Sequence, residues 1–131
     1  GGLIPAPYLN IIFLKEIFLM NTIDFIVGDN TYRLSLTTRS IVQLERQIGC
    51  NPLMLFMTSD GETRVPSMTE MVAVLHASLT RFNHGVSLND AYDIMDDFIA
   101  DGHATTDFIP VMIELFQASG IMPKENEEKN A

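Results

Sequence analysis

The chain is poor in cysteine and in basic residues, and each shortage excludes a class of protein. Its one thiol, Cys50, cannot form an intrachain disulfide or a multi-cysteine zinc site, and suits a reducing cytosol. We interpret Cys50 as a small apolar residue packed after a helix end, with a reactive thiol as the alternative. Eight Lys and Arg against 17 Asp and Glu give a formal net charge of −9. Such a chain lacks the basic surface that binds nucleic acid or an anionic membrane, so we expect apolar or basic partners.

The sequence also lacks the motifs that usually accompany catalysis. It has no glycine-rich phosphate loop, no nucleophile elbow and no paired metal-ligand histidines. The acid-rich stretch that starts at Asp97 fails as a calcium loop, because Ile99 and Phe108 stand where oxygen ligands are needed. We therefore predict no enzymatic activity, no cofactor and no metal site. The three scattered histidines, for which we predict no catalytic role, are His76, His84 and His103.

No apolar run is long enough to cross a membrane. Ile11–Leu14 and Ile17–Met20 are apolar, but Lys15 and Glu16 interrupt them, which leaves the run well short of the roughly 18 residues that a spanning helix needs. They also lack the basic start and small-residue cleavage site of a secretory signal. Because Met20 looks like a natural start, we interpret residues 1–19 as a leader that is vector-derived or translated from upstream sequence. The alternative is a short amphipathic helix or strand that packs on the domain or on a neighbouring copy.

The remaining sequence predicts one folded domain, residues 20–122, because 47% hydrophobic content is enough for an ordinary core. Residues 22–36 alternate apolar and polar on both sides of a Gly28–Asn30 turn, which predicts a β-hairpin. A lone hairpin is marginal in water, so its apolar face must lie on helices. Residues 123–131 have no apolar residue before the last alanine and are predicted to form a disordered polar tail.

Helix start and stop signals follow the hairpin. Thr37 and Thr38 are suitable N-caps for a helix that Gly49 closes, and Ser67 with Glu70 forms a capping box. The predicted helices are one between Thr37–Thr38 and Gly49, a short one at Asn51–Met57, a long one from Ser67–Met68 to Gly85, one capped by Ser87 and followed by Gly102, and a last one that starts near residue 107 and ends by Gly120. The fold class is therefore α+β, mostly α, with an N-terminal β-hairpin packed on a small bundle of four to five helices.

The helix after Ser87 is amphipathic. We interpret its acidic side as a solvated face, with a surface for a basic partner as the alternative. Its apolar residues are Leu88, Ala91, Ile94, Met95, Phe98 and Ile99, and the acidic ones are Asp90, Asp93, Asp96, Asp97 and Asp101.

The segment Asn51–Met57 is apolar on nearly every side. A two-turn element cannot direct all of these side chains into one core, so some should lie at a surface or an interface. Methionine adapts to varied apolar surfaces, and the polar loop Thr58–Pro66 next to it is expected to be mobile. The predicted protein-binding residues are Leu53, Met54, Phe56 and Met57. The alternative is that they complete the core.

The order of these features resembles a known family. A hairpin, then Thr-Thr-Arg-Ser-Ile-Val-Gln-Leu-Glu with Gly49 closing the helix, then Asn51-Pro52-Leu53 and a capped helical set, is similar to the small tail assembly chaperones of long-tailed bacteriophages and prophages. This family includes counterparts in gene transfer agents. The likeness covers roughly residues 21–122 and has no catalytic signature. The leader before Met20 departs from the family pattern.

The resemblance implies a role in virion assembly. Such chaperones are cytoplasmic in the bacterial host, are not part of the mature virion, hold the aggregation-prone tape measure protein soluble and help the tail tube protein polymerise around it. Many also have a longer form made by ribosomal frameshifting near the C-terminus, and the polar tail after Met122 resembles the end of the short form. The expected partners are thus the tape measure and tail tube proteins, and further copies of this chain in a homo-oligomer. We expect no binding to nucleic acid or to a membrane.

Two other functions remain as alternatives. One is a small acidic cytoplasmic protein-binding module and the other is a structural component of a phage tail. A DNA-reading module is disfavoured because the arginines are dispersed along the chain. They are Arg33, Arg39, Arg46, Arg64 and Arg81.

Overall fold

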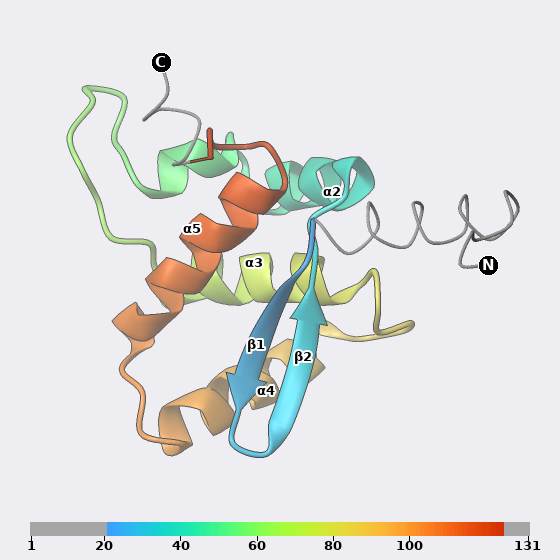
Figure 1. The fold of residues 1–131 in the computed structure, drawn as a ribbon. Helices are drawn as coiled ribbons and strands as arrows, with labels where there is room; N and C mark the ends of the chain where they lie inside the picture. The colour runs from blue at the N-terminus through green and yellow to red at the C-terminus, as the bar shows by residue number, and fades with distance from the viewer. Residues whose placement is uncertain (1–20, 125–131) are drawn as a thin grey trace, which may run out of the picture.

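The computed structural model describes residues 21–124 (Figure 1). The predicted leader, and residues 125–131 of the predicted tail, lie outside this range. The described elements are β1 (Ile23–Val27), β2 (Asn30–Leu34), α2 (Thr38–Ile48), the 3₁₀ helix η1 (Pro52–Leu55), α3 (Met68–Leu79), α4 (Leu88–Ala100), the 3₁₀ helix η2 (Thr105–Phe108) and α5 (Ile109–Ala118). The fold is α+β and mostly α, with the hairpin packed on the helices, as the sequence predicts.

The hairpin has the register that its alternation predicts. β1 and β2 pair antiparallel with Phe25 opposite Tyr32 and Val27 opposite Asn30. Gly28 has a φ of 58°, whereas the φ of Asp29 is not positive. Type II′ hairpin turns have this combination of backbone angles. The Gly28 N–H donates to Asp101 Oδ2 at 3.1 Å. This bond joins the turn to the C-terminal end of α4.

Helix α3 forms the centre of the molecule. It contacts α2, α4, α5 and β2, and Figure 1 shows it behind α5 and the hairpin. Eight of its twelve residues are buried, which is typical of a helix surrounded on most sides. The buried residues are Met71, Val72, Ala73, Val74, Leu75, Ala77, Ser78 and Leu79.

Two predicted helix boundaries were wrong. The long helix ends at Leu79 and not near Gly85, because the Leu79 carbonyl accepts hydrogen bonds from the backbone N–H and the side-chain amide of Asn83, which close the last turn. The last helix starts at Ile109 and not near residue 107. Asp107 accepts a hydrogen bond from the Ala104 N–H at 2.9 Å, which stabilises η2 ahead of it. Pro110 lies in the first turn of α5, as predicted.

The core is one cluster that joins the hairpin to the helices. Phe25 of β1 packs on Phe98 of α4 at a ring-centroid distance of 5.0 Å and on Phe108 of η2 at 5.4 Å. Burying each ring contributes about 1.5–3 kcal/mol. Arg81 donates a 2.8 Å hydrogen bond to the Oγ of buried Ser35, so this polar group inside the core has a partner.

Candidate protein-binding surface

The predicted binding segment is anchored at two points. The Asn51 side chain accepts a hydrogen bond from the Leu53 N–H at 3.0 Å and caps η1, as predicted for Asn51. Leu55 is fully buried, and the Phe56 ring meets the Phe116 ring of α5 edge to face at 5.6 Å. Part of the segment therefore belongs to the core.

The other side chains of the segment are incompletely covered. Met57 is 42% exposed, and Leu53, Met54 and Phe56 are half-buried. As the sequence predicts, a segment of two turns does not bury all of its apolar side chains. The four predicted residues lie within five consecutive positions, and each leaves part of its apolar side chain exposed. Whether this surface binds a protein stays a prediction.

Arg64 holds the segment against α3. Its Nη1 donates to the carbonyl oxygens of Met54 at 3.2 Å and Leu55 at 3.3 Å, which lie at the end of η1. The same guanidinium makes a two-pronged ion pair with Glu70 in the first turn of α3, at 3.2 and 3.0 Å. In the sequence, Arg64 is one of five dispersed arginines, and no role was predicted for it. Its partners are six to ten residues away in sequence, so no local spacing predicted them.

The ion pair affects the acidity of Glu70. Burial alone would raise the pKa of this carboxyl group. Hydrogen bonds from the Arg64 guanidinium and from the Ser67 backbone N–H outweigh burial, and the pKa is lowered below its ordinary value. Pairing with Arg64 therefore keeps the Glu70 carboxylate ionised to lower pH than an ordinary glutamate.

The loop that follows the segment has defined backbone pairing. The Thr58 N–H donates to the Glu62 carbonyl at 2.7 Å, and the Arg64 N–H donates to the Phe56 carbonyl at 2.9 Å. Met57 and Thr63 form an isolated antiparallel bridge. These bonds fix the direction in which Met57 leaves η1. The predicted mobility of the loop stays a prediction.

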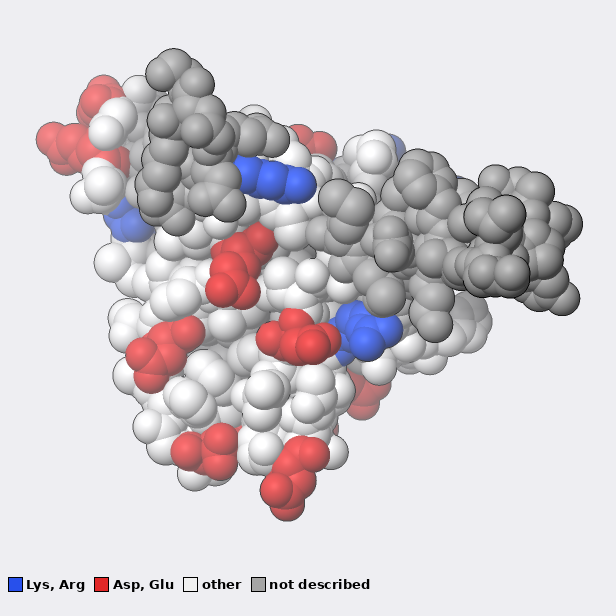
Figure 2. Space-filling model, viewed as in Figure 1, with Lys and Arg blue, Asp and Glu red and all other residues white. Residues whose placement is uncertain are grey.

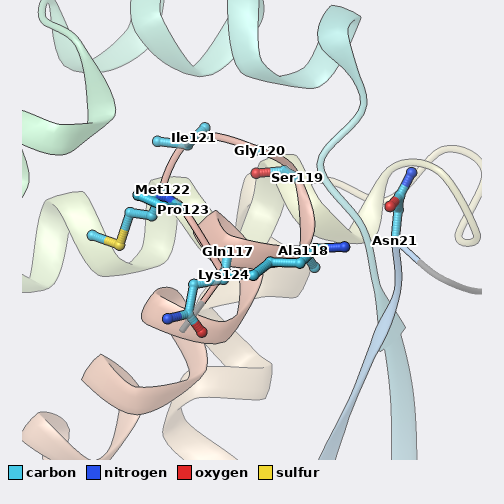
Figure 3. A pocket seen from close by; sticks show the side chains of 9 residues that line it. All are labelled: Asn21, Gln117, Ala118, Ser119, Gly120, Ile121, Met122, Pro123 and Lys124. Carbon is cyan, nitrogen blue, oxygen red and sulfur yellow. The ribbon is translucent and has the colours of Figure 1, made fainter. Parts of the chain in front are cut away.

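A hollow of about 570 Å³ lies at the end of α5 (Figure 3). Figure 3 shows that its wall is the turn from Gln117 to Lys124, with Asn21 across from it. The turn is closed by a hydrogen bond from the Met122 N–H to the Phe116 carbonyl at 3.0 Å. Of the described residues that line it, Lys124 alone is charged, and none is a histidine or a carboxylate.

A second hollow, about 350 Å³, lies between the hairpin turn and the end of α4 and is acidic. It is lined by Asp29, Asp97 and Asp101, among others. Within residues 21–124 no group of three or more His, Cys, Asp or Glu side chains has the geometry to hold a metal ion.

The three histidines lie apart in the described structure. His76 Nε2 is 3.1 Å from the Val86 carbonyl and bridges α3 to the loop before α4. His103 stacks on Phe98 at 4.2 Å and lies 3.8 Å from Asp101 and 3.6 Å from Asp107, which ties the end of α4 to η2. His84 is exposed in the loop before α4.

The chain belongs to a family of unknown function, DUF6096, whose model matches residues 20–131. No curated protein and no solved structure matches the chain. Among the helices of residues 21–124, none has the length and apolar character needed to span a membrane.

Proposed function

We propose that this chain is a non-enzymatic tail assembly chaperone of a phage or prophage. In this role it binds the tape measure protein in the host cytoplasm and assists polymerisation of the tail tube. The proposal starts from the resemblance of the hairpin, the Thr37–Gly49 helix and Asn51-Pro52-Leu53 to such chaperones.

The observation that carries the proposal is the incomplete burial of the η1 segment. A chaperone for a long, aggregation-prone client needs adaptable apolar surface on a body that remains soluble. Leu53, Met54, Phe56 and Met57 supply apolar surface, two of them through flexible methionines. The acidic composition, with a formal net charge of −9, supplies repulsion between copies.

The test replaces Met54 and Met57 with serine and co-expresses the full chain with a tape measure protein of a long-tailed phage. The methionines are partly exposed, so we expect the melting temperature to fall by only a few degrees. The soluble, co-purifying fraction of the tape measure protein should fall about tenfold, because apolar contact area is lost at the interface.

The control is Ile26→Thr, which changes a residue 63% exposed on β1. It should leave both the melting temperature and client solubility close to wild type. A double serine variant that unfolds without a selective loss of client binding would show that these methionines complete the core. Client solubility that never depends on this chain would contradict the chaperone proposal as a whole.

A further inference from the structure

A separate apolar groove lies between α3 and α4. It is a hollow of about 260 Å³, and its lining residues are Met68, Val72, Tyr92, Met95, Asp96 and Ile99. Val72 and Met95 are buried and form its floor. Three large side chains at its edges stay open to solvent, with Met68 38%, Tyr92 46% and Ile99 38% exposed. Ile99 belongs to the apolar residues that the sequence predicts for this helix, and the structure places it at this groove.

The groove follows the direction of both helices. Met68 and Val72 lie one turn apart on α3, and Tyr92, Asp96 and Ile99 follow one another over two turns of α4. Seven residues of helix correspond to roughly 10 Å. A trough of this length between two packed helices accepts the apolar stripe of a third helix, with side chains set into the groove.

The charges around the groove have one sign. From residue 82 to residue 123 the chain contains no lysine or arginine. The same stretch contains the carboxylates Asp90, Asp93, Asp96, Asp97, Asp101, Asp107 and Glu114. Asp96 lines the groove, and Asp93 is exposed one turn before it on the same side of α4. On the face seen in Figure 2, the lower end, where α4 and the hairpin turn lie, shows acidic side chains and no basic ones.

We infer that the α3–α4 groove binds an amphipathic helix of another protein whose apolar stripe is flanked by lysine or arginine. The apolar edges of Met68, Tyr92 and Ile99 take the stripe. The carboxylates of Asp93 and Asp96 attract the flanking cations and fix the orientation of the helix. The inference does not depend on the identity of the client in the chaperone proposal, and the groove is lined by none of the η1 residues.

A second copy of this chain fits the groove less well. The helix exposed beside it, α4, carries four aspartates and no basic residue, so pairing like helices would bring carboxylates together. The formal net charge of −9 adds repulsion between copies. A basic helix removes both costs.

The experiment titrates the full chain with a fluorescent, designed peptide of roughly 18 residues, long enough to become helical on binding. Leucines form one stripe and lysines flank it. One matched peptide has the same residues in scrambled order, and another has glutamate in place of lysine. We expect micromolar binding of the lysine peptide that weakens with added salt, and at least about tenfold weaker binding of both controls. In the wild-type chain, NMR methyl signals of Met68, Met95 and Ile99 should shift while those of Val42 on α2 do not.

Variants separate the apolar and the electrostatic contributions. Tyr92→Gln with Ile99→Gln should weaken binding at least about tenfold, whereas Val42→Gln, at a residue 39% exposed on α2, should not. Asp96→Asn should weaken binding about two- to fivefold at low salt and reduce its salt dependence. Asp60→Asn, at an exposed position in the loop before α3, is the charge-matched control.

Several results would overturn the inference. They are equal binding of the scrambled peptide, full affinity in the Tyr92 and Ile99 double variant, absence of methyl shifts at the groove, and no binding up to about 1 mM peptide. A concentration-dependent dimer that the same double variant abolishes would assign the groove to a second copy. If tape measure solubility depends on Met54 and Met57 but not on the groove, the chaperone proposal stands. The peptide titration of the groove then decides the groove inference separately.

Discussion

At the scale of single residues, Arg64 has the most connections of the described side chains around η1. One guanidinium joins the carbonyl end of η1 to the first turn of α3, through four hydrogen bonds. The Arg64 and Glu70 side chains are 33% and 21% exposed, so solvent screens the pair only in part. Removing the arginine leaves a partly buried carboxylate without its main partner.

Arg64→Met should lower the free energy of unfolding by about 1–2 kcal/mol at neutral pH. The pKa of Glu70 should rise at the same time, because burial remains while the cation is lost. In the wild-type fold the pKa of Glu70 is lowered. The stability that the ionised carboxylate contributes is therefore complete above the ordinary pKa of 4.5, and it is lost as the pH falls through the folded pKa.

The stability difference between wild type and Arg64→Met should therefore be largest above pH 4.5 and shrink in stronger acid. Urea unfolding across this range and NMR titration of the Glu70 carboxyl group measure both effects. Arg39→Met, at an exposed position of α2, is the control and should stay within about 0.5 kcal/mol of wild type. A difference that is constant with pH would mean that Arg64 acts through packing alone.

The sequence could identify residues whose role is local. Asn51, Thr37 and Ser67 cap their helices through partners two or three positions away, and each was predicted. Arg64 could not be predicted, because its partners come together only after a loop folds back. Tyr92 was missed for a different reason. It stands next to Asp93 and one turn before Asp96, on the side that the aspartates mark as solvated, whereas Ile99 was assigned to the apolar side.

At the scale of elements, the start of α3 is specified by a complete capping box. Ser67 Oγ accepts from the Glu70 N–H at 3.2 Å, and Glu70 Oε1 accepts from the Ser67 N–H at 2.8 Å. Because Glu70 also pairs with Arg64, the capping box and the η1 contact share one carboxylate. The helix start and the binding segment are thereby coupled.

Ser67→Ala should lower the free energy of unfolding by about 0.5–2 kcal/mol, the usual cost of losing a helix cap. The loss is larger than for an isolated cap if the Glu70 carboxylate also becomes less well oriented toward Arg64. Chemical denaturation measures it, with Ser59→Ala in the exposed loop as the matched control. Equal stabilities of the two variants would contradict the coupling.

One helix end was predicted correctly and another was not. The end of α2 was marked by Gly49, which has a φ of 76° and donates its N–H to the Glu45 carbonyl. The end of α3 has no glycine at the boundary. Asn83 closes it through its side chain, and the apolar Phe82 that follows made the periodic pattern look longer than the helix.

At the scale of the whole molecule, the burial of α3 distinguishes this fold from a hairpin resting on separate amphipathic helices. In the sequence, Met71, Val72, Leu75 and Leu79 recur at helical spacing and form one apolar stripe on α3. The structure buries Ala73, Val74, Ala77 and Ser78 as well, because β2, α2, α4 and α5 surround the helix. Small and β-branched residues between the larger ones permit this close approach, but which neighbours use them depends on the tertiary arrangement.

The same arrangement explains why the apolar groove remains open. Near its N-terminal end α3 is covered by α4 on one side, and the hollow leaves Met68 of α3 with Tyr92 and Ile99 of α4 exposed. No local pattern distinguishes an apolar residue that a neighbour covers from one that it leaves open. The overall fold was therefore predictable from periodicity and caps, and the partial exposure of the segment Asn51–Met57 from its apolar composition, whereas the α3–α4 groove needed the packing.

Leu75→Ala tests whether α3 stabilises all of its neighbours together. Leu75 is fully buried at the middle of α3, and its truncation should cost about 2–5 kcal/mol of unfolding free energy. This is a large part of the roughly 5–15 kcal/mol typical of small domains. Because α3 contacts β2, α2, α4 and α5, amide hydrogen exchange should accelerate in all four elements by similar factors. Val42→Ala on the exposed side of α2 should change neither measurement, and a loss of protection confined to α3 and one neighbour would show that the domain unfolds in separate parts.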